Sequence, residues 1–108
     1  MNEAYVIQTI REYAEEYLAE PDSNCTKDVF RQLSYSRWAV DEILDRIVEE
    51  ASKLPPHITG ISLVPHTEII QEFIDEMDYL ADASETENSR TMFATAKSTG
   101  IEVLNLFK

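Results

Sequence analysis

Residues 36–54, SRWAVDEILDRIVEEASKL, decide the fold class of this chain. Apolar side chains recur here at steps of three and four residues, and charged side chains fill most positions between them. The apolar members are Val40, Ile43, Leu44, Ile47, Val48, Ala51 and Leu54. This spacing lines one side of an α-helix with apolar groups, which must be buried against other elements. We therefore expect a central amphipathic helix that the rest of the chain covers.

Three further segments show the same period and predict helices that cover this stripe. The first is residues 3–20, the second begins near Pro65, and the last follows Ser84. Strand-like alternation is absent, and the length suits one core. We predict an all-α, single-domain bundle of four main helices over residues 1–108, with a proline-rich connector at residues 55–64 between the central and third helices.

The beginning of the central helix admits two interpretations. Thr26 suits an N-cap, and the apolar residues after it stay in phase with the central stripe, so residues 26–53 could form one long helix. Against this, Ser34 and its neighbours are weak helix formers, and Ser36 could cap a new start. We favour a kink or short break between Ser34 and Ser36, which would make five helices, because an unbroken helix would overhang its shorter neighbours.

The last helix carries two local signals. Ser84 and Glu87 have the spacing of a capping box, which predicts a fresh helix start after residue 83. Gly100 lies on the apolar stripe four residues after Ala96. Either a neighbouring helix approaches closely at Gly100, or the helix breaks there.

The charge of the chain limits the classes of partner that it can bind. The sequence has 21 Asp and Glu residues against 9 Lys and Arg, a net charge of −12. Such a surface repels nucleic-acid phosphates and anionic lipids and attracts basic partners. The first twenty residues lack the apolar core of a signal peptide, and Cys25 is the only cysteine. We expect a cytoplasmic protein without direct nucleic-acid or membrane contact.

Four carboxylates on two predicted helices raise the question of catalysis. Glu12 and Glu15, followed by Glu42 and Asp45, resemble the acidic pattern of the all-α nucleoside triphosphate pyrophosphatases related to the MazG family. The resemblance implies a metal-dependent hydrolase that holds Mg²⁺ on helix carboxylates. Helical phase places these side chains opposite the apolar stripes, whereas a metal site inside a bundle needs inward-facing oxygens.

Other chemistry has weaker support in the sequence. A zinc site is conceivable from His57, His66 and Glu68, although histidines near loops are more often unliganded. Cys25 lies before a predicted helix start, but no nucleophile motif surrounds it. No P-loop, dinucleotide-binding glycine pattern or Gly-x-Ser-x-Gly motif occurs. We expect no cofactor and no catalysis.

An aromatic patch is the first candidate partner-binding surface. Trp38 is out of phase with the central stripe, and Tyr35 lies near the same side, with Arg37 beside them. Either these side chains pack on residues 21–34, which we favour, or they form an exposed anchor for a partner.

An acidic face is the second candidate surface. No Lys or Arg occurs between Lys53 and Arg90, and the third helix lacks the opposite-charge pairs at four-residue spacing found in the first and central helices. The candidate partner-binding residues on this face are Glu68, Glu72, Asp75, Glu76 and Asp78. Such a run is usually a solvated face, but it also suits a basic partner.

These surfaces predict a small acidic interaction or regulatory protein without catalysis. It would engage a basic partner, even as a nucleic-acid mimic or inhibitor. The alternatives are the metal-dependent hydrolase above and an obligate homo-oligomer whose aromatic patch completes its own core.

Overall fold

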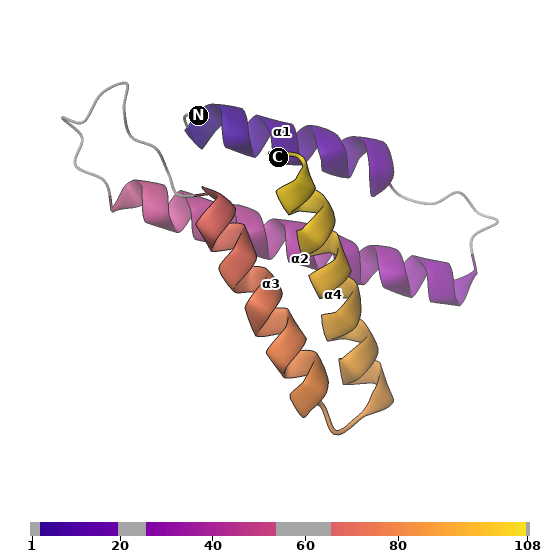
Figure 1. The fold of residues 1–108 in the computed structure, drawn as a ribbon. Helices are drawn as coiled ribbons and strands as arrows, with labels where there is room; N and C mark the ends of the chain where they lie inside the picture. The colour runs from indigo at the N-terminus through magenta and orange to yellow at the C-terminus, as the bar shows by residue number, and fades with distance from the viewer. Residues whose placement is uncertain (1–2, 20–25, 54–65, 108) are drawn as a thin grey trace.

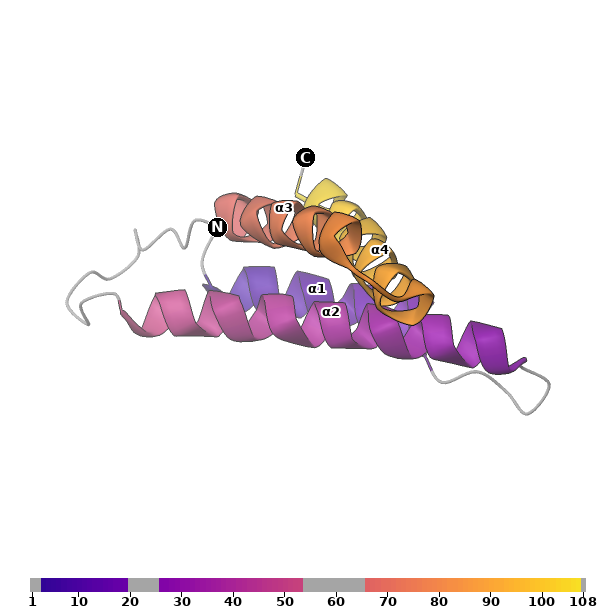
Figure 2. The same ribbon diagram turned by 90° about the horizontal axis from the view of Figure 1, so that it is seen from below.

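The computed structural model describes residues 3–19, 26–53 and 66–107, which contain four α-helices. The helices are α1 (Glu3–Tyr17), α2 (Lys27–Ser52), α3 (His66–Ala83) and α4 (Glu87–Asn105). Helices α1 and α2 run antiparallel in one layer, and α3 and α4 form a hairpin that crosses one side of it (Figures 1 and 2). The predicted all-α bundle of four main helices is confirmed. The predicted connector at residues 55–64 lies outside the described ranges, as do Cys25 and His57.

One hydrophobic cluster joins the four helices. The central stripe supplies Val40, Ile43 and Ile47, which are all buried. The fully buried side chains from the other helices are Val6, Ile10, Ile70, Phe73, Met77, Ala96 and Val103. Burying an aliphatic or aromatic side chain of this size stabilises the fold by about 1.5–3 kcal/mol. Helical periodicity, read from the sequence, therefore identifies most of the core.

Helix α2 is continuous, so the break favoured between Ser34 and Ser36 is wrong. The Ser34 hydroxyl donates to the Phe30 carbonyl at 3.0 Å, and the Ser36 and Thr99 hydroxyls hydrogen-bond at 2.9 Å between α2 and α4. Both serines therefore satisfy their polar groups without leaving the helix. Thr26 caps α2 as predicted, since its Oγ1 accepts from the Val29 N–H at 3.2 Å. The first turns of α2 extend past α4, as an unbroken helix requires (Figure 1).

Helix α4 begins two residues later than the capping box predicts. Its N-cap is Thr86, whose Oγ1 accepts from the Ser89 N–H at 3.2 Å. The Ser84 hydroxyl instead donates to the Leu80 carbonyl at 2.6 Å. Ser84 therefore bonds back to the end of α3 rather than starting α4, and its assignment as the cap is wrong.

Gly100 lies inside an unbroken helix, at its contact with α3. A Cβ atom placed on Gly100 would lie 2.9 Å from Cγ1 of Ile74, closer than carbon atoms normally approach. The close approach predicted at this glycine is confirmed, and the alternative of a helix break is wrong.

Tyr13 connects α1 to the C-terminal part of α4. Its side chain is buried, and its hydroxyl donates to Oε2 of Glu102. Burial raises the pKa of the Tyr13 phenol well above 10, and the hydrogen bond to Glu102 and the negative charge of its carboxylate raise it further. The phenol therefore stays protonated in the folded chain at a pH where it ionises in the unfolded chain.

This pKa shift predicts a loss of stability at alkaline pH. Because the folded pKa exceeds the unfolded value of about 10, the stabilisation is complete below pH 10 and declines as the pH rises above it. We expect Tyr13→Phe to cost about 1–2 kcal/mol at pH 8 and to flatten the decline of unfolding free energy between about pH 10 and 12. Urea denaturation across this range measures both effects. Tyr79→Phe is the control because Tyr79 is exposed; equal alkaline slopes for wild type and Tyr13→Phe would contradict the prediction.

Candidate functional site

An acidic groove lies between the C-terminal half of α2 and the N-terminal half of α3. Helical spacing brings side chains three and four residues apart to the same face of each helix. The groove has a volume of about 300 Å³, at the lower end of volumes for small-molecule pockets. Its lining residues are Arg46, Glu49, Glu50, Glu68, Ile69 and Glu72. We call this site the α2–α3 acidic groove.

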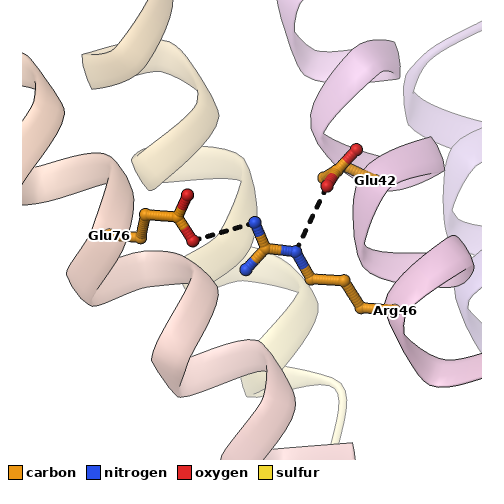
Figure 3. Close-up of polar contacts among 3 residues, drawn as sticks. All are labelled: Glu42, Arg46 and Glu76. Atoms are coloured by element: carbon orange, nitrogen blue, oxygen red, sulfur yellow. Dashed lines mark hydrogen bonds and ion pairs between the residues drawn. The ribbon is translucent and has the colours of Figure 1, made fainter. Parts of the chain in front are cut away.

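Arg46 is held in place from three sides. Its Nε lies 3.3 Å from Oε1 of Glu42, and its Nη2 lies 2.8 Å from Oε2 of Glu76 on α3 (Figure 3). Its guanidinium carbon also lies 5.2 Å from the ring centre of Phe73. Partial burial lowers the pKa of Arg46, but the hydrogen bonds and attraction to Glu76 and Glu42 outweigh this and raise it. Two carboxylates already neutralise this guanidinium, so it does little to offset the other charges of the groove.

The remaining carboxylates of the groove differ in their pairing. Oε1 of Glu50 lies 3.0 Å from Nζ of Lys53, and this contact raises the pKa of the lysine. Glu68 and Glu72 have no hydrogen bond or ion pair with any side chain in the described ranges. These two exposed carboxylates, and that of Glu49, which also lacks a hydrogen bond or ion pair within the described residues, give the groove an uncompensated negative charge, which favours a cationic ligand.

Metal binding lacks a suitable ligand set in the part of the chain that the structure describes. There, no three His, Cys, Asp or Glu side chains are arranged to hold an ion. The zinc alternative also needs His57, which lies outside that part, while the ring of His66 meets the Phe107 ring edge-on at 4.7 Å. The unpaired carboxylates of the groove can attract ammonium or guanidinium groups.

The acidic face predicted on α3 divides into separate environments. Glu68 and Glu72 line the groove, and Glu76 binds Arg46. Asp75 accepts a hydrogen bond from Gln71 at 3.0 Å, and Asp78 pairs with Lys97 of α4 at 2.8 Å. The lack of opposite-charge pairs within α3 does not leave Glu76 and Asp78 unneutralised, because their cations come from neighbouring helices.

The residues of the aromatic patch point toward three different helices. Tyr35 shares a surface pocket with residues of the first turn of α4, whereas Nε of Arg37 donates to the Leu18 carbonyl at 2.7 Å, just after α1. Trp38 is 40% exposed, and its ring centre lies 6.3 Å from that of Phe73 on α3. We expected Trp38 to pack on residues 21–34, and its contact with Phe73 on α3 was not predicted. The three side chains do not form one patch, because nearby helix positions face different directions.

The four carboxylates that resemble the pyrophosphatase pattern do not meet at one site. Glu15 and Asp45 line a second groove, between α1 and α2. Glu12 accepts a hydrogen bond from Gln8 at 3.0 Å, and Glu42 points to Arg46 on the side of α3.

Glu49, Glu50 and Arg46 were not predicted as parts of a site. The four-residue spacing of Glu42 and Arg46 indicates their pairing. No sequence signal links Arg46 to Glu76, because that contact depends on how α2 and α3 pack.

Comparisons of the chain with protein-family models, with curated proteins and with solved structures find no match in any of the three. Within the described ranges, every helix is too short or too polar to cross a membrane. The fold and the groove together define an all-helical protein with an acidic surface site. The function is therefore inferred from the chemistry of that site.

Proposed function

We propose that this protein is a cytoplasmic, non-enzymatic interaction module that binds a basic segment of a partner protein in the α2–α3 acidic groove. The observation that carries the proposal is the pair Glu68 and Glu72, which line the groove without a cation from the described residues. The nearby Arg46 is already matched by Glu42 and Glu76. A lysine or arginine side chain from a partner supplies the missing positive charge.

The size and lining of the groove favour a basic side chain over a larger ligand. Its volume of about 300 Å³ suits side chains better than a whole helix. Ile69, which is 7% exposed, is the apolar residue among those that line the groove beside the glutamates. Lysine and arginine place a charged head on an aliphatic stem, which matches this combination. The net charge of −12 also speeds the approach of a cationic partner.

Mimicry of a nucleic acid is a narrower form of this proposal. It requires a row of free carboxylates along α3, whereas Glu76 and Asp78 are paired with Arg46 and Lys97. We therefore favour a short basic segment as the ligand over a surface that normally binds phosphates.

A binding experiment with a fluorescent ten-residue peptide of alternating lysine and alanine tests the proposal. We expect Glu68→Gln/Glu72→Gln to weaken peptide binding at least about tenfold, because it removes both unpaired carboxylates that α3 contributes while keeping their shape. Wild-type affinity should also fall as salt rises from about 50 to 200 mM, since exposed charges are screened. Fluorescence anisotropy measures both effects.

The matched control removes the same charge outside the groove. Asp82→Asn/Glu85→Gln changes two exposed carboxylates and should alter affinity less than about twofold. Equal weakening by the two double variants would show that the peptide responds to net charge alone, and the groove would lose its assigned role.

A further inference from the structure

A second groove lies between α1 and α2, the two helices of the layer that α3 and α4 cross on one side (Figure 2). It has a volume of about 550 Å³, and all of the described residues that line it belong to α1 or α2. A shallower hollow beside Leu18 and Arg37 continues it, because the two share four lining residues. The groove is lined by Ile7, Arg11, Ala14, Glu15, Val40, Asp41, Leu44, Asp45 and Val48. We call it the α1–α2 groove.

The floor of this groove is apolar and partly open to water. Val48 belongs to the central apolar stripe, yet 47% of its surface is exposed. Ile7, Ala14 and Leu44 are only partly buried. An apolar strip between two charged edges is typical of a surface that a protein partner covers.

The charged groups of the α1–α2 groove are unpaired within the described residues. Arg11, Glu15, Asp41 and Asp45 form no hydrogen bond or ion pair through their side chains there, although they line the same groove. Nη2 of Arg37, in the continuation, is buried without a hydrogen-bond partner. Elsewhere in the described ranges, the cations Arg46, Lys53 and Lys97 each contact a carboxylate, whereas the exposed Lys27 and Arg31 do not. The groove thus keeps unsatisfied charges of both signs.

This balance of charge identifies the occupant. The groove and its continuation carry three carboxylates and two guanidinium groups, in a chain whose net charge is −12. A basic partner would leave Arg11 and Arg37 unmatched, and an acidic partner would leave the carboxylates unmatched. A second copy of the same groove supplies both signs, because a two-fold contact sets one surface against itself.

We infer that the α1–α2 groove is the two-fold interface of a homodimer. Arg11 on α1 of one copy faces Asp41 and Asp45 on α2 of the other, and the same contact forms twice. The exposed Val48 side chains are covered in this dimer. The α2–α3 acidic groove shares no lining residue with the α1–α2 groove and stays open in each copy, so the two proposals stand independently.

Sedimentation equilibrium of charge-reversed variants tests the dimer. The wild type should show a concentration-dependent dimer between about 1 and 300 µM, within the range of weak specific complexes. Arg11→Glu alone, and Asp41→Arg/Asp45→Arg alone, should each raise the dimer dissociation constant at least about tenfold, because every substitution acts twice. Circular dichroism verifies that each variant keeps its helices.

The decisive experiment mixes Arg11→Glu with Asp41→Arg/Asp45→Arg. In the mixed dimer the new glutamate of one chain faces the new arginines of the other, and the original Arg11 faces the original Asp41 and Asp45. We therefore expect the mixture to dimerise within about threefold of the wild-type constant.

The control is Asp82→Arg/Glu85→Arg, which makes the double charge change outside the groove. It should leave the dimer at least as stable as in the wild type. A monomeric wild type over the whole range, a dimer that neither groove variant weakens, or a mixture that stays monomeric would each overturn the inference. Arg11→Glu and Asp41→Arg/Asp45→Arg should still bind the lysine–alanine peptide. A failure to dimerise can therefore be distinguished from a failure of the proposed function.

Discussion

Replacing Phe73 with alanine is expected to lower the free energy of unfolding by about 3–5 kcal/mol. Phe73 is fully buried, and its ring contacts Trp38 and Arg46 on α2. The ring also lies against Gly100 on α4, so truncation opens a cavity where three helices meet. Domains of this size are stable by only about 5–15 kcal/mol, so the loss is a large part of the total.

Trp38 provides a built-in probe for this prediction. It is the only tryptophan in the chain, and it packs against Phe73. We expect its emission to shift to longer wavelength in folded Phe73→Ala, because water gains access to the indole. Urea denaturation followed by Trp38 fluorescence and by circular dichroism measures the loss of stability.

Tyr79→Ala is the matched control for Phe73→Ala. Tyr79 lies on the same helix but is 71% exposed, so its truncation should change stability by less than about 0.5 kcal/mol. If both variants unfolded at the same urea concentration, the core would not be closed around α3 as described.

The helices could be predicted from sequence because their main signal is local. The apolar stripe of residues 36–54 and the Thr26 cap depend on spacing along one segment. The continuity of α2 could not be predicted, because the Ser36 hydroxyl is satisfied by Thr99 on another helix. The N-cap of α4 was misplaced for a related reason: Ser84 and Thr86 can both accept from a helix start, and Ser84 bonds back to α3.

The candidate site was only partly predictable. The acidic run of α3 is visible in the sequence, and it contains Glu68 and Glu72. Which of its members stay unpaired depends on Arg46 and Lys97, whose positions are set by packing between helices. Neighbours in sequence also separate in space, which is why Arg37 and Trp38 contact different helices.

The close contact between Gly100 and α3 predicts how much a larger side chain at this position would destabilise the fold. Gly100→Val is expected to lower the free energy of unfolding by about 2–3 kcal/mol. Its Cβ would lie 2.9 Å from Cγ1 of Ile74 and 3.3 Å from Cδ1 of Phe73, and both neighbours are buried. The better helix propensity of valine offsets this by only a few tenths of a kcal/mol. For a domain of this size, the loss corresponds to a fall in Tm of about 10–20 °C.

Thermal denaturation of Gly100→Val, Gly100→Ala and Ala94→Val separates packing from propensity. Ala94 is exposed on the same helix, so valine there should cost only about 0.5 kcal/mol, its propensity difference from alanine. Gly100→Ala gains about 1 kcal/mol in propensity and should nevertheless fail to raise the Tm, because its Cβ meets Ile74. A higher Tm for Gly100→Ala would mean that α3 yields at this contact. Gly100 would then be a tolerated glycine rather than a requirement of the α3–α4 packing.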